Sequence, residues 1–97
     1  MRIIARSRLR DFWEKHNDAE VPLKIWYKIV EVHEWKNSQE VKKIFGNASI
    51  IGNNRVVFNI KGNDYRLVTY MVYKYQKVFI RFVGTHKEYD KIDSRTV

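Results

Sequence analysis

The sequence contains no cysteine and no long run of apolar residues. Without cysteine, neither a disulfide framework nor a thiolate metal site is possible, which suits a reducing compartment. The amino-terminal segment has only Ile3, Ile4 and Ala5 as an apolar run, far shorter than a secretory signal or a membrane span of about 20 residues. We therefore expect a soluble, cytoplasmic protein that is not embedded in a membrane.

The motifs of several enzyme classes are also missing. No GxxxxGK[ST], GxGxxG or HExxH occurs, so P-loop nucleotide hydrolysis, dinucleotide binding and zinc protease chemistry lack their parts. There is no internal repeat, low-complexity segment or linker. With 97 residues, 44% of them hydrophobic, the chain has enough apolar material for one core. We predict a single domain over residues 1–97.

Positive charge is abundant. Lysine and arginine total 19 against 11 acidic residues, a formal net charge of +8 with a pI near 9.8. Such an excess indicates an anionic partner, because net charge informs about association and not about fold. Nucleic acid, an acidic protein and a membrane surface all fit, and the choice depends on where the charge lies.

The first half of the chain reads as a short strand over 2–5 followed by helices. Ser7 is the expected N-cap of a helix over Arg8–His16, and Asp18 that of a second helix from Ala19 to about Lys36. Apolar residues at helical spacing give both helices a buried face, so they form an αα-hairpin. The spacing of Asn37 and Glu40 predicts a capped third helix that Gly46 ends.

In the second half the hydrophobic period changes to that of strands. Residues 47–54 are interpreted as a turn-rich connector, and strands are predicted over Arg55–Ile60, Tyr65–Tyr73 and Lys77–Thr85. The intervening segments are short enough for hairpins, which gives an antiparallel meander. The expected fold class is α+β, with an antiparallel β-sheet and the αα-hairpin packed on one face.

Alternation divides the strand residues into two faces. Val56, Phe58, Ile60, Leu67, Thr69, Met71, Val78, Ile80 and Phe82 form the predicted core face. The other face mixes cations with rings, as an RNA-binding surface does, although a solvated sheet face is the plainer alternative. A one-residue bulge would exchange the two faces within a strand. The predicted second face comprises Arg55, Val57, Asn59, Lys61, Arg66, Val68, Tyr70, Val72, Lys74, Lys77, Phe79, Arg81 and Val83.

His86 directly follows the last predicted strand, and Tyr89 lies three residues further on. RNA cleavage without a metal needs a base for the 2′-hydroxyl, an acid for the 5′-oxygen and cations for the phosphate. We predict His86 as the general base or acid. Arg66 and Arg81 are predicted to clamp the phosphate, because guanidinium stays charged and bonds it in a bidentate manner. Tyr89 would donate a proton or stack on a base.

A metal site is the alternative use of the residues around His86. Glu88 and Asp90 suggest one together with His86, but two carboxylates and one histidine among many cations are a poor setting for a dication. We predict no metal and no cofactor, and expect the two carboxylates to orient His86 or neighbouring cations. His16 and His33, in predicted helices, are interpreted as structural.

Two segments carry a resemblance to a known family. The runs VVFNIKGNDYRLV, from Val56 to Val68, and QKVFIRFVGTHKEYDKID, from Gln76 to Asp93, resemble the HigB toxins of bacterial toxin–antitoxin systems. These toxins are similar in fold to the RelE group of messenger-RNA interferases, with a short C-terminal helix. The family's motif falls on Asn59, Gly62, Asn63, Arg66, Arg81, Thr85, His86, Tyr89 and Asp90.

The resemblance implies a toxin that cleaves messenger RNA during translation on the ribosome. A HigA-like helix-turn-helix antitoxin would neutralise it by docking on the αα-hairpin or on the basic face. Beyond the catalytic group, the predicted RNA contacts are Arg55, Asn59, Lys61, Tyr70, Lys77 and Lys87. Two alternatives stay open at this point: a ParE-like toxin that acts on a protein target such as gyrase, and a non-catalytic RNA-binding module.

Overall fold

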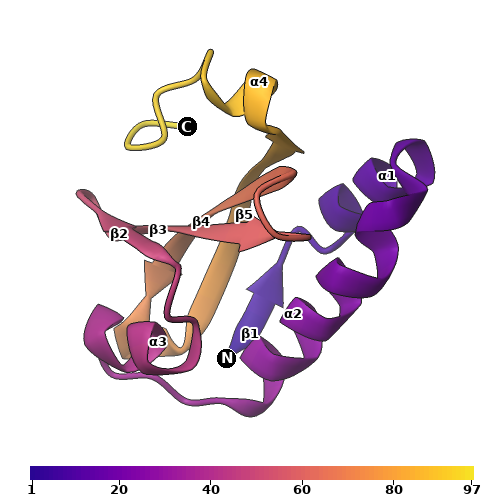
Figure 1. The fold of residues 1–97 in the computed structure, drawn as a ribbon. Helices are drawn as coiled ribbons and strands as arrows, with labels where there is room; N and C mark the ends of the chain where they lie inside the picture. Colours follow the sequence, from indigo (N-terminus) through magenta and orange to yellow (C-terminus); the bar gives the residue numbers. More distant parts are fainter.

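The computed structural model describes all residues, 1–97, and has an α+β architecture built on a five-stranded mixed sheet. The strand order is β1-β5-β4-β3-β2. Figure 1 shows α1 and α2 along one side of the sheet, α3 near its lower end, and α4 with the C-terminal segment at the top. The elements are β1 (Arg2–Ile4), α1 (Ser7–Lys15), η1 (Asn17–Ala19), α2 (Glu20–Val32), α3 (Ser38–Ile44), β2 (Ser49–Ile51), β3 (Arg55–Ile60), β4 (Tyr65–Val72), η2 (Tyr73–Tyr75), β5 (Lys77–Thr85) and α4 (His86–Tyr89).

The predicted meander is confirmed in β3, β4 and β5, which pair antiparallel in chain order. Two further strands complete the sheet. β1 pairs in parallel with β5, so the sheet is mixed and not antiparallel throughout. β2 pairs antiparallel with β3, which corrects the interpretation of residues 47–54 as a connector. A three-residue strand that depends on pairing with its neighbour leaves little periodic signal of its own.

Both helices of the predicted αα-hairpin form, but neither side-chain cap does. Ser7 is the first residue of α1 and not its cap, and no side chain caps this helix. Asp18 lies in η1, and the cap position of α2 belongs to Ala19. α2 ends at Val32, four residues before the predicted end, because His33 is extended and the chain turns to bury Trp35 in the core.

The third helix agrees with its predicted cap. The Asn37 side chain accepts a hydrogen bond of 3.0 Å from the backbone N–H of Glu40. The Glu40 carboxylate in turn accepts from the backbone N–H of Lys36 at 2.6 Å. This second bond reaches one residue beyond the cap, so the reciprocal pattern of a capping box is shifted by one position.

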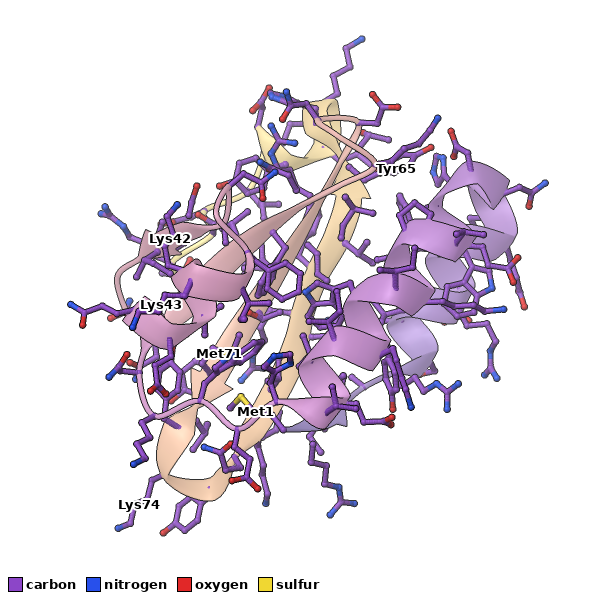
Figure 2. All side chains as sticks on the ribbon, turned by 60° about the horizontal axis from the view of Figure 1, so that its bottom comes forward. Met1, Lys42, Lys43, Tyr65, Met71 and Lys74 are labelled. Carbon is purple, nitrogen blue, oxygen red and sulfur yellow. The ribbon has the colours of Figure 1, made fainter.

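The hydrophobic core lies between the helices and one face of the sheet. Trp26 of α2 meets Phe58 of β3 edge-on, with the ring centroids 5.4 Å apart. In Figure 2, Met1 and Met71 lie in this interior while Lys43 and Lys74 point outward. Apart from Phe82, the predicted core-face residues are buried: Val56, Phe58, Ile60, Leu67, Thr69, Met71, Val78 and Ile80.

Phe82 departs from the prediction because β5 contains a bulge. Val68 pairs with Phe82 and the next residue, Thr69, pairs with Ile80, so Arg81 has no partner on β4. The extra residue exchanges the faces beyond it. Val83 therefore lies beside Leu67 and packs against the core, whereas Phe82 joins Val68 on the other face. The predicted faces of Phe82 and Val83 are thus reversed.

No helix combines the length and the hydrophobicity needed to cross a lipid bilayer.

Candidate functional site

The sheet face that turns away from α1 and α2 carries a row of cations and rings. Arg55, Tyr70 and Phe79 occupy paired positions on β3, β4 and β5. The Arg55 guanidinium lies 4.8 Å from the centre of the Tyr70 ring, and the Arg81 guanidinium lies 5.4 Å from the same centre. One tyrosine ring therefore contacts two guanidinium groups, a favourable arrangement because the ring faces are electron-rich.

The centre of this face is more apolar than its predicted mixture of cations and rings. Val57 and Val68 are buried and pair with each other, and Val68 also pairs with Phe82 of β5. The cations therefore surround an apolar strip, with Arg55 and Arg81 on one side and Arg66 on the other.

Arg81 owes its position to the bulge. Arg81 is exposed and has no partner residue on β4, and no carboxylate forms an ion pair with its guanidinium. Its backbone carbonyl accepts a hydrogen bond of 2.9 Å from Nη1 of Arg8 in α1. The helix thus holds the bulge from the side, while the Arg81 guanidinium stays available to an anion.

Arg55 is bound within the protein instead. Its Nη2 donates to the carbonyl oxygen of Val97 at 2.8 Å, and its Nη1 donates to that of Asn53 at 3.0 Å. Asn53 also donates through Nδ2 to the carbonyl of Arg95 at 3.1 Å. These bonds fasten the last residues of the chain to the turn between β2 and β3, so Arg55 is half-buried and has a structural role.

The third arginine, Arg66, lies at the end of the sheet under α4. It is half-buried opposite Asn59 and Gly84, and its guanidinium is 6.0 Å from the centre of the Tyr89 ring. Nη1 donates to the carbonyl of Asn63 at 3.0 Å. Arg66 and Tyr89, predicted from different segments of the chain, are thus neighbours.

Helix α4 begins directly at the strand end because Thr85 and Glu88 form a capping box. The Thr85 hydroxyl accepts from the backbone N–H of Glu88 at 3.2 Å, and the Glu88 carboxylate accepts from the backbone N–H of Thr85 at 2.8 Å. The bond from the Thr85 backbone, more than the nearby charge of His16, lowers the pKa of Glu88. Glu88 therefore serves the helix and does not orient His86.

His86, the first residue of α4, is held by Asp90 one turn later. Nδ1 lies 3.2 Å from Oδ2 of Asp90, and the His86 side chain is 54% exposed. Asp90 thus acts as the expected orienting carboxylate. Among the hydrogen bonds and ring contacts of the molecule, none joins His86 to Arg66, Arg81 or Tyr89.

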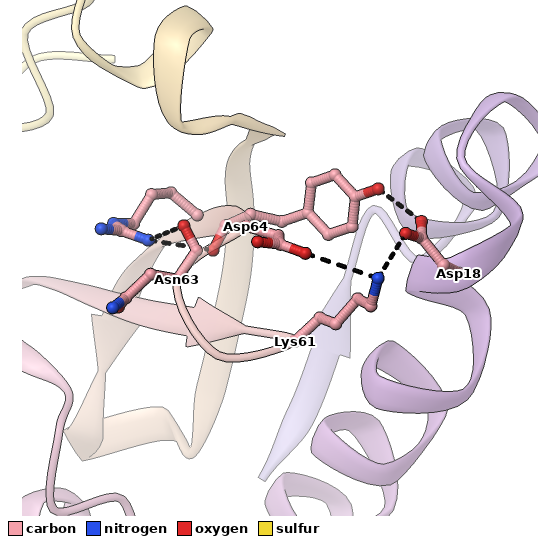
Figure 3. Close-up of polar contacts among 6 residues, drawn as sticks. Asp18, Lys61, Asn63 and Asp64 are labelled. Carbon is pink, nitrogen blue, oxygen red and sulfur yellow. Dashed lines mark hydrogen bonds and ion pairs between the residues drawn. The ribbon is translucent and has the colours of Figure 1, made fainter.

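Lys61 and Asp18 belong to a clasp between the helical hairpin and the β3–β4 turn (Figure 3). Lys61 pairs with Asp18 at 2.7 Å and with Asp64 at 3.4 Å, and the Tyr65 hydroxyl donates to Asp18. The hydrogen bond from Lys61, followed by that from Tyr65, lowers the pKa of Asp18. Asp18 therefore forms tertiary contacts in place of the predicted cap, and two carboxylates engage the Lys61 ammonium.

The remaining predicted contacts lie around this face. Asn59 is half-buried and donates through Nδ2 to the carbonyl of Asn47 at 3.3 Å. Lys77 pairs with Arg2 and Val72 at the end of β5 away from α4. Lys87 is exposed on α4 and makes no ion pair. No group of three histidine or acidic side chains is placed to hold a metal ion.

His16 occupies a position that sequence reasoning missed. It stacks on Phe12 with the ring centroids 4.4 Å apart, which agrees with a structural role. It also lines an open hollow of about 350 Å³ between α1 and β5, together with Arg8, Lys15 and Arg81. The spacing of Phe12 and His16 places them on one helix face, but only the packing of α1 against β5 shows what lies opposite.

This fold defines the class: a five-stranded mixed sheet with helices packed on one face and a short C-terminal helix has the RelE-like architecture. A family model described as "HigB_toxin, RelE-like toxic component of a toxin-antitoxin system" matches residues 19–92. The chain therefore belongs to the HigB toxin family, whose members are paired with an antitoxin.

Named relatives cover nearly the whole chain. The chain is 30% identical over 92 residues to the "mRNA interferase toxin HigB" of Escherichia coli K12, covering 93% of this chain and 88% of that protein. The "mRNA interferase HigB" of Shigella flexneri matches equally. A third relative of that name, from Escherichia coli O6:H1, is 22% identical over 94 residues, with 95% and 91% covered.

Proposed function

We propose that this protein is an endoribonuclease that cleaves messenger RNA during translation on the ribosome and so inhibits protein synthesis. The proposal includes a reaction without a metal ion and a HigA-like helix-turn-helix antitoxin as the partner. The names of the relatives support RNA cleavage. The observation that carries the proposal for this chain is the exposed, unpaired Arg81 beside Tyr70, on the sheet face that also bears Arg66.

The proposed reaction is attack of the RNA 2′-oxygen on the adjacent phosphorus atom. The bond between phosphorus and the 5′-oxygen breaks, which leaves a 2′,3′-cyclic phosphate and a 5′-hydroxyl. A base must take the 2′-proton, an acid must protonate the departing 5′-oxygen, and cations must stabilise the charge on the phosphate.

The cations differ in how free they are to act. Arg81 presents an exposed guanidinium on a bulge whose backbone carbonyl accepts a hydrogen bond from Arg8, so we assign it to the scissile phosphate. Arg66 is held by the Asn63 carbonyl and faces Tyr89, so it would bind the same or the next phosphate in a fixed orientation. Lys77 and Lys87 would guide the flanking backbone.

His86 is assigned to proton transfer. Asp90 contacts Nδ1, which leaves Nε2 of the exposed ring free to face the RNA. Tyr89 is packed near Phe82, with the ring centroids 6.5 Å apart, and would stack on a base or donate the second proton. The His86 ring is half exposed and makes no contact with Arg81. We expect the bound RNA and the ribosome to bring these two side chains into their working positions.

The decisive experiment compares His86→Ala and Arg81→Ala with Lys43→Ala, which removes an exposed cation on α3 that points outward (Figure 2). Loss of a general acid or base reduces the rate by about 100-fold or more, so both site variants should lose cleavage in a purified translation system while Lys43→Ala keeps it. If folded His86→Ala and Arg81→Ala proteins cleave as fast as wild type, these role assignments are wrong.

The same assay tests the conditions of the reaction. We expect cleavage of messenger RNA with ribosomes present and none of the free transcript, and we expect the isolated cleavage step to persist after a chelator removes free Mg²⁺ from preformed complexes. Mapping transcript 5′ ends after induction tests the activity in cells. Growth arrest without new ends would contradict the nuclease and favour a toxin with a protein target.

A further inference from the structure

The outer side of the α1–α2 hairpin carries a surface that the proposed RNA site does not use. Two adjoining hollows of about 320 and 200 Å³ share Arg6 and Trp13. Six of the residues that line these hollows form what we call the hairpin surface: Arg6, Arg10, Trp13, Lys24, Tyr27 and Lys28.

The hairpin surface is cationic around two half-buried rings. The Arg6 guanidinium lies 4.9 Å from the centre of the Tyr27 ring, and the Lys24 ammonium lies 5.3 Å from that of Trp13. No acidic residue lines either hollow, and neither Arg6 nor Arg10 forms an ion pair. Lys24 pairs with Glu20 at 2.5 Å and Lys28 with Glu31 at 3.6 Å. The charge that remains to attract an anionic group is therefore that of Arg6 and Arg10, beside the apolar area of the two rings.

Exposed aliphatic side chains continue the surface along α2. Val21 is 65% exposed, Ile25 56% and Val32 63%. Their spacings of four and seven residues place them on one helix face, opposite the side that is buried in the core. Large aliphatic groups that gather on a surface, rather than being scattered, are typical of a protein contact.

We infer that the hairpin surface, with Val21, Ile25 and Val32, binds an acidic segment of the antitoxin whose apolar side chains enter the hollows. An apolar centre with a charged rim, rich in tryptophan, tyrosine and arginine, is the usual anatomy of a protein interface. RNA would use the rings and the cations but has no use for three exposed aliphatic side chains. The inference rests on the antitoxin partner, but it does not depend on the chemistry at Arg81 and His86.

The test is titration calorimetry with the purified antitoxin encoded beside this toxin. The double variant Arg6→Glu/Arg10→Glu and the single variant Ile25→Asp probe the charged and the apolar parts. The control is Lys43→Glu, which reverses one exposed charge on α3 where the double variant reverses two. We expect Kd to rise at least 10-fold for both hairpin variants and less than 2-fold for the control, with circular dichroism and RNA cleavage unchanged.

Several outcomes would overturn the inference. The inference is wrong if the hairpin variants bind the antitoxin with a Kd within 2-fold of wild type. It is also wrong if only Arg81→Glu abolishes binding, because the antitoxin would then lie on the sheet face. Hairpin variants that weaken binding of a single-stranded RNA oligonucleotide but not of the antitoxin would reassign the surface to RNA. A toxin that binds no neighbouring gene product would also refute it. Hairpin-dependent antitoxin binding by a chain that cuts no RNA would refute the proposed function alone.

Discussion

At the scale of single residues, the position of Arg81 depends on one extra residue in β5. The bulge removes Arg81 from the regular ladder, exposes its guanidinium and turns Phe82 toward Tyr89. A strand without the bulge would place Phe82 in the core and Val83 on the opposite face. Bulges commonly re-aim side chains next to active sites, which is the role that we propose here.

Gly84 allows Phe82 to take this place. A Cβ atom on Gly84 would lie 2.5 Å from Cζ of Phe82 and 3.1 Å from Oε1 of Glu88. Gly84→Ala should therefore push Phe82 and α4 outward, lowering the free energy of unfolding by about 1–3 kcal/mol. Denaturant unfolding followed by circular dichroism measures the change.

The control for this prediction is Gly46→Ala. No atom lies within 4 Å of a Cβ built there, and its backbone is not in the left-handed region. We expect Gly46→Ala to alter the free energy of unfolding by less than about 1 kcal/mol. If the two variants unfold at the same denaturant concentration, the close packing around Gly84 does not contribute to stability.

At the scale of elements, the clasp of Asp18, Lys61 and Tyr65 joins the helical hairpin to the β3–β4 turn. This contact spans more than forty residues of sequence, so the local sequence could not reveal it. The local pattern around Asp18 instead predicted a helix cap. The clasp holds the helical hairpin against the sheet. The inner face of the hairpin packs in the core, and its outer surface stays exposed.

The clasp should make stability depend on pH in the acid range. Its hydrogen bonds lower the pKa of Asp18 in the folded protein below the unfolded value of about 3.9. The stabilisation is therefore fully present above that value and is lost as the pH falls through the folded pKa. Asp18→Asn should lower the midpoint of thermal unfolding at pH 7, and its difference from wild type should shrink below about pH 4.

The matched control is Asp11→Asn, because the exposed Asp11 carboxylate has no hydrogen-bond or ion-pair partner. This variant should keep the wild-type midpoint at both pH values. A constant difference between Asp18→Asn and wild type from pH 7 to pH 3 would show that the charge of Asp18 does not stabilise the fold.

At the scale of the whole molecule, the chain has a net charge of +8, and two groups of its cations lie on opposite sides of the sheet. Arg66, Arg81, Lys77 and Lys87 surround the proposed RNA site, whereas the cations of the hairpin surface lie on the other side of the sheet. An electrostatic excess of this kind raises the rate of association with RNA and with acidic proteins alike.

RNA binding should accordingly be strongly salt-dependent. Each phosphate contact to single-stranded RNA contributes about −0.7 to the slope of log K against log salt. Four contacts give a slope of about −3, or a roughly 50-fold loss of affinity between 50 and 200 mM salt. Fluorescence anisotropy with an uncleavable 2′-O-methyl oligonucleotide measures the slope.

Single variants separate local contacts from general attraction. Arg81→Ala should make the slope shallower by about 0.7, while Lys43→Ala on α3 should leave it unchanged. Equal effects of the two substitutions would mean that RNA binds the charged surface without a defined site.

The sequence by itself determined the order of the helices, the three long strands, the core residues on β3 and β4, the Asn37 cap and the family resemblance. The resemblance rests on the residues of two runs, Val56–Val68 and Gln76–Asp93, and the other features follow from local periodicity and spacing, which a short stretch of chain carries whatever surrounds it. The strand β2, the parallel pairing of β1, the bulge at Arg81, the clasp at Asp18 and the bond from Arg55 to the C-terminal residues were decided only by the tertiary structure. Each depends on a partner distant in sequence or on the register of a neighbouring strand, and no local pattern encodes such a contact. His86 illustrates both levels: its segment identified it as a candidate, and the fold showed that Asp90 holds it while Glu88 caps the helix.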